Sequence, residues 1–506
     1  MAMGYRPVDR DQMFLLPADM RDWLPTHHFV WFLLAVIEEL DVSAFEASRR
    51  LGSVGRQGYD PRMLLGLLTY AYAGGQRSSR RIEELCVTDV AFRVICAEDV
   101  PDHSTIARFR RENREAVAGL FVQVLELAGE AGLGRVGVVA IDGTRIAANA
   151  SYGANRRRSW LWQQVDEAMA EADRVDAEED VLFGEDNPSR VAEPWCDPNT
   201  RADRIRAALG RAEQTAAQAA QAEEAKVAAR RARVEDSAER VARQRAAAEA
   251  RWEDYQRRRA EAEAQGSPPP TGRRPAPPEQ ACGTRRALAR LAANQARLAE
   301  AEAAVALAVC DPVANLTDPD SGWMPTGKGW IQGYNTQLAV SDDQIVLAVK
   351  VSNATVDFAQ FEPMMAAAIA GAEILDRGRV RAGAESEPIR LLLADAGYLS
   401  EHNLTLPGPD RLIATTKRQR LEAMSRRGEV AGRKSELIEQ MSIRLATEAG
   451  IQAYRRRGVT VEPVNGHLKD RHGLRQFSCR GLKAAQAEAE LASATANMLK
   501  IWRCRN

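Results

Sequence analysis

Apolar positions in the first quarter of the chain recur at a helical spacing. They line one face over 26–40, and a second helix begins at Asp60-Pro61 and ends at Gly74-Gly75. His103-Ser104 begins a further short helix. Short helices separated by tight turns are what a helix-turn-helix domain requires. Residues 1–130 are therefore predicted to form an all-α, helix-turn-helix-like N-terminal domain.

Short β-branched and apolar runs appear on both sides of a long middle segment. Residues 136–141 predict a buried strand that a turn at Asp142-Gly143 closes, and 389–394 predict another that ends at Asp395. Further strands are expected at 335–340, 345–351 and 412–415, with helices at 358–375 and from about 435 onward. The sequence thus predicts a mixed α/β domain made of residues 134–154 and 311–506.

The middle segment, 155–310, is rich in Ala, Arg, Glu and Gln, which form helices readily but bury little surface. A heptad stripe precedes the proline-rich linker 267–278 and another follows it, which predicts an antiparallel coiled-coil hairpin. The alternative is a long solvated helix with no partner. The two stripes consist of Val227, Val234, Val241, Ala248 and Tyr255, and of Leu291, Leu298 and Val305.

Composition narrows the class of protein. The 506 residues are 45% hydrophobic, with a net charge of −1, so total charge does not indicate a nucleic-acid partner. The seven cysteines form no CxxC pair, which argues against a zinc module and fits a reducing cytoplasm. The longest apolar run, 29–37, is too short to span a membrane, and no signal peptide is evident. We expect a soluble, cytoplasmic protein.

Two acidic residues follow apolar strands in the same way. Asp142 comes after Val-Val-Ala-Ile and Asp395 after Leu-Leu-Leu-Ala. Carboxylates at the carboxyl ends of neighbouring strands point into one crevice, and two of them close together repel unless a cation lies between them. Hard oxygen ligands select Mg²⁺ or Mn²⁺. Taken singly, each residue is better explained as part of an ordinary turn.

A third acid strengthens the case. Pro463 suits the first turn of a helix, so Glu462 is expected at a helix start, with Lys469 on the same face two turns later. Such a carboxylate and amine can hold a metal and a neighbouring phosphate. Alone, the stretch is also explained as a charged helix N-terminus.

Several blocks in order resemble the DDE transposases of bacterial insertion sequences, in which a helical N-terminal domain precedes a ribonuclease-H-like core. Tyr454, Arg457, Glu462 and Lys469 approximate the group's tyrosine–arginine–glutamate–lysine signature, with the interval from arginine to glutamate one residue longer than usual. The other matching blocks are Tyr59-Asp60-Pro61, Ser78-Ser79-Arg80-Arg81-Ile82-Glu83, Pro101-Asp102-His103-Ser104-Thr105-Ile106, Ile141-Asp142-Gly143-Thr144, Gln332-Gly333-Tyr334-Asn335-Thr336-Gln337, Asp395-Ala396-Gly397-Tyr398 and Val461-Glu462-Pro463-Val464.

The resemblance implies an activity and a set of ligands. Asp142, Asp395 and Glu462 would hold two divalent cations, Mg²⁺ or Mn²⁺, for cleavage and strand transfer of transposon-end DNA. The partner would be double-stranded DNA, bound by a homodimer or a higher oligomer. Residues 134–154 and 311–506 would be the ribonuclease-H-like catalytic domain, and 1–130 would bind DNA.

Basic side chains near these blocks are candidate DNA contacts, mainly to phosphates. A second basic cluster lies at 418–433, and such clusters are also explained as solvated faces. The candidates are Tyr454, Arg456, Arg457 and Lys469 beside the third acid, and Arg108, Arg110 and Arg111 on the helix that His103 begins.

Two other functions stay open at the level of sequence. A ribonuclease-H-like nuclease would cut without joining, although it would not need the N-terminal blocks. A non-catalytic DNA-binding or coiled-coil protein would explain the Arg/Ala-rich middle but not the three acids. The insert at 155–310 is an arm that positions DNA or bridges protomers, or a decoration without a role.

Overall fold

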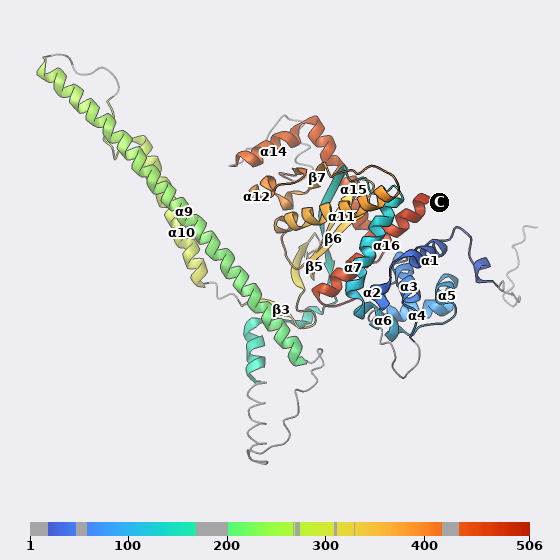
Figure 1. The fold of residues 1–506 in the computed structure, drawn as a ribbon. Helices are drawn as coiled ribbons and strands as arrows, with labels where there is room; N and C mark the ends of the chain where they lie inside the picture. Colours follow the sequence, from blue (N-terminus) through green and yellow to red (C-terminus); the bar gives the residue numbers. More distant parts are fainter. Residues whose placement is uncertain are drawn as a thin grey trace, which may run out of the picture. The chain divides into compact units, whose positions relative to one another are not determined.

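The computed structural model describes residues 19–46, 58–167, 201–266, 268, 274–307, 311–327, 329–416 and 435–505. Contacts divide the chain into two units, Met1–Ala154 with Thr317–Asn506, and Asn155–Leu316. The first holds the N-terminal helices and a mixed sheet, and the second holds the helical insert (Figure 1). The chain is thus mixed α/β with a helical N-terminus, as the sequence predicts.

The N-terminal region is helical over its described residues, and short polar caps determine where its helices begin. The Asp60 side chain accepts a hydrogen bond from the Arg62 backbone N–H, and Pro61 occupies the first turn of α3. Asp102 caps α6 in the same way, so His103 is its first residue. The helices are α1 (Phe29–Glu39), α2 (Ser43–Glu46), α3 (Pro61–Ala73), α4 (Ser79–Thr88), α5 (Val90–Cys96), α6 (His103–Glu112) and α7 (Arg114–Glu130).

One sheet joins strands from both sides of the insert. The described strands pair in the order β4-β5-β1-β7-β8, and β6 also pairs with β5. β1 runs antiparallel to β5 and parallel to β7, which is parallel to β8. The strand before the insert therefore lies between strands that follow it. The bounds are β1 (Val138–Ala147), β4 (Gly322–Thr326), β5 (Gly329–Ser341), β6 (Val346–Ser352), β7 (Leu391–Ala394) and β8 (Asp410–Ile413).

Helices pack on this sheet and on the N-terminal region around a common core. α11 and α16 contact β6, α15 contacts β1 and β5, and α7 contacts α11 and α16. The N-terminal helices α1 and α3 also pack on α16, where the ring of Phe29 meets that of Trp502 edge-on. One cluster of buried apolar side chains extends from α1 to α16. The remaining helices of the first unit are α11 (Phe361–Arg381), α12 (Glu401–Thr405), α14 (Glu436–Ala446), α15 (Glu448–Asp470) and α16 (Leu482–Arg505).

The insert is built on two long helices, α9 (Arg201–Ala264) and α10 (Cys282–Leu307), and on the two-stranded pair β2 (Asn155–Arg157) and β3 (Val313–Asn315). The helices lie antiparallel, because Arg231 bonds Glu302 while Arg245 bonds Glu279 (Figure 1). Their supercoiling as a coiled coil stays a prediction. Half of the proline-rich linker 267–278 lies outside the described residues. No helix in the described ranges has an apolar stretch long enough to cross a membrane.

Candidate active site

Strand pairing brings the first two acids together. β1 and β7 are parallel neighbours in which Ile141 pairs with Ala394, so the next residues, Asp142 and Asp395, lie side by side. Asp395 follows β7, as the sequence predicts, and its Oδ1 accepts a hydrogen bond from the Gly397 backbone N–H at 2.8 Å. The convergence of these two carboxylates is a direct consequence of the parallel register.

The predicted turn at Asp142-Gly143 is wrong. β1 continues to Ala147, because its second half pairs with β5 and that pairing outweighs the local turn preference. Gly143 serves close packing instead: a Cβ atom there would lie 2.5 Å from the Gln337 side-chain nitrogen and 2.9 Å from an Asp357 oxygen. Asp142 thus projects from the middle of a strand that is hydrogen-bonded on both sides.

The predicted helix start at Glu462 is also wrong. α15 begins at Glu448, where the Thr447 side chain caps it, so Glu462 and Pro463 lie in its interior. A proline there leaves the carbonyl four residues earlier without its helical donor. That carbonyl belongs to Val459, and it accepts a hydrogen bond from the side-chain amide of Gln344 at 2.9 Å. A residue distant in sequence therefore supplies the missing donor.

Arg457 links the three acids. Its guanidinium lies 2.6 Å from Asp142 Oδ1, 4.0 Å from Asp395 Oδ2 and 3.7 Å from Glu462 Oε1. The Arg457 side chain is only 12% exposed, whereas that of Glu462 is 57% exposed. Asn465, also on α15, donates from Nδ2 to Asp142 Oδ2 at 3.0 Å. Three carboxylates from distant parts of the chain thus surround one cation.

Burial controls the charge balance of the cluster. It raises the pKa of Asp142 to about 6; the Arg457 charge opposes this rise and the Asp395 charge adds to it. Burial alone would lower the pKa of Arg457, but Asp142 and Asp395 outweigh it and raise that pKa. Burial and Arg475 lower the pKa of Lys469, against the attraction of Asp142. Lys469 is therefore close enough to Asp142 for their charges to interact.

A network of polar side chains centred on Asp357 lies next to the cluster, and the sequence did not predict it. Asp357 Oδ1 accepts hydrogen bonds from Arg145 at 3.1 Å, Asn335 at 2.7 Å and Gln337 at 2.9 Å. A Cβ atom at Gly397 would lie 3.3 Å from its other oxygen. Asn335 and Gln337 belong to a block that the sequence analysis singled out, but no local pattern marks Asp357. Asp357 thus lies against the backbone that follows both Asp142 and Asp395.

Two family models match the chain. Residues 18–112 match a transposase domain (DUF772), and residues 416–502 match a transposase DDE domain. Both matches are thus to transposase domains, and the second is to the DDE domain. No curated protein and no solved structure matched it in the corresponding searches. The transposase is thus an enzyme that cuts and transfers DNA, and its second matching segment contains Arg457 and Glu462.

DDE transposases in general use divalent metal ions. The donor set of this transposase fits such ions in kind, because carboxylate oxygens are the ligands that Mg²⁺ and Mn²⁺ prefer. The geometry, however, has Arg457 at the centre: among the described residues no three His, Cys, Asp or Glu side chains are close enough to share a metal ion. Arg457 Nε and Asn465 Oδ1 are buried without a hydrogen-bond partner in the structure. The three carboxylates would converge on a metal only after Arg457 moved.

The candidate DNA contacts of the transposase differ in their surroundings. Arg456 is 45% exposed and forms an ion pair with Asp342, whereas Tyr454 is buried. Arg110 donates to the Arg77 backbone carbonyl at 2.8 Å, so α6 packs against the rest of the N-terminal region at this residue. Arg108 and Arg111 are exposed. The basic cluster at 418–433 lies outside the described residues.

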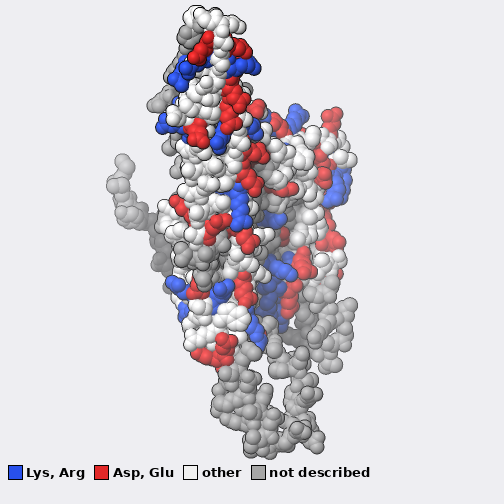
Figure 2. Space-filling model, turned by 90° about the vertical axis from the view of Figure 1, so that its left-hand side faces the viewer, with Lys and Arg blue, Asp and Glu red and all other residues white. Residues whose placement is uncertain are grey.

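The visible surface agrees with local rather than global recognition of DNA. On the face drawn in Figure 2, basic and acidic side chains are interspersed, as the net charge of −1 leads us to expect. Attraction for phosphates must then come from small groups of Lys and Arg.

Proposed function

We propose that this transposase cleaves transposon-end DNA and joins it to a target at a site made of Asp142, Asp395 and Glu462. The observation that carries the proposal is the contact of all three carboxylates with the Arg457 guanidinium. In a DDE transposase, acids that converge in this way would hold the metal ions needed for phosphoryl transfer. Two Mg²⁺ or Mn²⁺ ions bound by these acids would activate the attacking hydroxyl and stabilise the leaving oxygen.

The side chains around the acids have separate tasks in this proposal. Asn465 and the Asp357 network hold Asp142 and the adjacent backbone in place. Lys469, which is half-buried near Asp142, would contact the phosphate next to the scissile bond. Arg457 would neutralise the acids before catalysis and turn to DNA when metal is bound. Arg456, Arg108 and Arg111, which are exposed, complete the proposed DNA contacts.

The wider architecture is assigned on the same basis. The strand order, with β1 between antiparallel β5 and parallel β7, supports a ribonuclease-H-like catalytic domain made of residues 134–154 and 311–506. Residues 1–130 would bind DNA. The insert, 155–310, would form a coiled-coil arm, and two or more copies would hold the two ends, acting on the nucleoid.

The test compares wild-type protein with Asp142→Asn, Asp395→Asn and Glu462→Gln on a duplex that carries the ends flanking the gene. We expect Mg²⁺-dependent cleavage and joining to fall at least about a thousandfold in each variant, with DNA binding retained. Glu448→Gln, at an exposed position on the same helix as Glu462, is the matched control and should stay active. Cleavage by Asp142→Asn at the wild-type rate would refute the assignment. If the wild type cleaves DNA but does not join it, the protein is a nuclease and the strand-transfer part of the proposal is wrong.

A further inference from the structure

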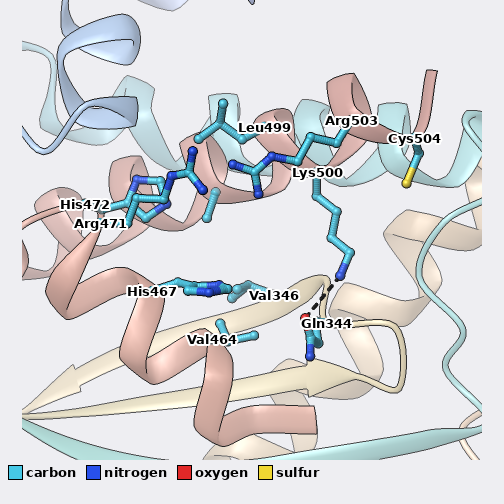
Figure 3. Close-up of a pocket in the computed structure, with 11 residues that line it drawn as sticks. Gln344, Val346, Val464, His467, Arg471, His472, Leu499, Lys500, Arg503 and Cys504 are labelled. Carbon is cyan, nitrogen blue, oxygen red and sulfur yellow. Dashed lines mark hydrogen bonds between the residues drawn. The ribbon is translucent and has the colours of Figure 1, made fainter. Parts of the chain in front are cut away.

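A cavity lies beside α15, and none of the three acids lines it. Its volume is about 240 Å³, and its walls come from α15, α16 and the turn between β5 and β6 (Figure 3). Val464 and His467 contribute from α15, whereas Arg457 and Asn465 of the same helix contact Asp142. α15 thus contributes to the cavity and to the acid cluster through different residues.

The cavity is lined by nitrogen-bearing side chains. Arg471, Lys500 and Arg503 lie around it together with His467 and His472, and in Figure 3 the two guanidinium groups approach each other while His467 lies between them and Gln344. None of the eleven residues that line it is acidic. Across the described ranges, no carboxylate forms an ion pair with any of these three cations. The cavity therefore carries an uncompensated positive charge.

The pKa shifts of the basic side chains around the cavity agree with a site of net positive charge. Burial lowers the pKa of Lys500, and burial together with the Arg471 charge lowers that of Arg503. Burial also lowers the pKa of His472, whose Nδ1 lies 3.0 Å from the Tyr72 carbonyl oxygen. Lys500 is half-buried, whereas Arg471 and Arg503 are exposed. A bound anion would lower the repulsion among these three charges.

The nearest acid does not neutralise them. Asp343 attracts Lys500, but its carboxylate already accepts hydrogen bonds from the backbone N–H groups of Gly134 and Arg135 and from the Ser341 hydroxyl. The Lys500 amine instead lies 3.4 Å from Gln344 Oε1. A neutral amide leaves the ammonium charge free to attract a ligand.

We propose that the cavity between α15, α16 and the β5–β6 turn binds a phosphate group of the DNA backbone. A phosphate offers several acceptor oxygens to the Arg471 and Arg503 guanidiniums and to Lys500, and such charge-assisted hydrogen bonds are the strong ones. DNA as the source rests on the proposed function. The phosphate is not the scissile one, because none of the three acids lines the cavity.

The experiment compares two double variants that remove equal charge from α16. Lys500→Gln with Arg503→Gln alters the cavity, and Lys483→Gln with Arg505→Gln, both exposed and outside it, is the control. Binding of a fluorescein-labelled duplex is measured by anisotropy over a range of salt concentrations. We expect the cavity variant to bind about tenfold more weakly than the control. We also expect the slope of log affinity against log salt to be shallower by about two. Equal affinities and slopes would overturn the proposal.

A second measurement uses the wild-type chain. Cys504 lines the cavity and is exposed, and Cys282 in the insert is an exposed reference. We expect the duplex to slow alkylation of Cys504 relative to Cys282, as followed by peptide mass spectrometry. Protection by inorganic phosphate, with equal DNA binding by the two double variants, would make this a free-phosphate site and reject DNA as the ligand. If the double variant does not fold, Arg503→Gln and Arg505→Gln give the same comparison. Asp142→Asn should bind the duplex normally, so a failure of either proposal is recognised separately.

Discussion

The Arg457 guanidinium and the Asp142 carboxylate form an ion pair of 2.6 Å at the centre of three acids. If Arg457 were removed or displaced, the three carboxylates would lose their cationic partner. They could then bind a divalent cation. The arginine therefore competes with metal for the same oxygens. It also keeps the acids together when no metal is bound, since like charges at this distance repel.

The first prediction concerns Arg457→Gln. Loss of the competing charge should strengthen binding of Mn²⁺ to DNA-free protein by about tenfold, equivalent to ~1.4 kcal/mol. Strand cleavage should nevertheless decrease, because the proposed DNA contact is lost as well. Mn²⁺ affinity is measured by calorimetry or by electron paramagnetic resonance, independently of activity. Arg456→Gln, which removes an exposed charge paired with Asp342, is the control and should leave Mn²⁺ affinity unchanged. Weaker Mn²⁺ binding by Arg457→Gln would show that the arginine does not compete.

The second prediction concerns Asp357→Asn. The amide oxygen can keep the position of Oδ1, but the amide nitrogen then faces the Arg145 donor that Oδ2 accepts from at 3.3 Å, and the charge opposite Arg145 is lost. We therefore expect the free energy of unfolding to fall by about 1.5–3 kcal/mol. Cleavage should fall too, because the backbone beside both acids loses its support. Denaturant titration measures the stability. Asp410→Asn, which loses an exposed ion pair with Arg444, should lose less than about 1 kcal/mol.

The same variant has a pH signature. Burial would raise the pKa of Asp357, but hydrogen bonds from Arg145, Asn335 and Gln337 outweigh it and lower the pKa. An acid with a lowered folded-state pKa stabilises the protein above its unfolded-state pKa of about 3.9, and this contribution disappears as the pH falls through the folded-state value. The stability difference between wild type and Asp357→Asn should therefore be full at neutral pH and shrink below about pH 4. A difference independent of pH would exclude the ionised carboxylate as its cause.

Local sequence patterns located most elements and the two strand-borne acids. Alternating and buried runs placed the strands near β1, β5, β6, β7 and β8, and apolar runs of this kind are short-range signals. The errors arose where a distant segment overrode a local preference. Asp142-Gly143 resembles a turn, but β5 pairs along both residues, and Pro463 resembles a helix start, but Gln344 satisfies the carbonyl that it leaves open.

The site itself was predicted only in part. The three acids follow from strand ends and from the family resemblance, whereas the central position of Arg457 depends on three-dimensional convergence. Asp357 and the cavity cations could not be found from sequence, since no spacing connects Arg471 with Lys500 and Arg503. Arg471 is close to Lys469 in sequence, yet it lies at the cavity.

The last prediction tests the crossing of α7 and α11, which holds the N-terminal helices to the sheet domain. Gly129 on α7 approaches the α11 backbone so closely that a Cβ atom would lie 2.0 Å from the Leu375 carbonyl oxygen. Backbone cannot give way as a side chain can, so Gly129→Ala must separate the helices and should lower the free energy of unfolding by about 1–3 kcal/mol or more. Gly119, on the same helix, has open space around it, and Gly119→Ala should stabilise by up to about 1 kcal/mol through helix propensity. Thermal and denaturant unfolding measure the change in the free energy of unfolding for each variant. The two changes should have opposite signs if the helices cross as described, and the same sign if they do not.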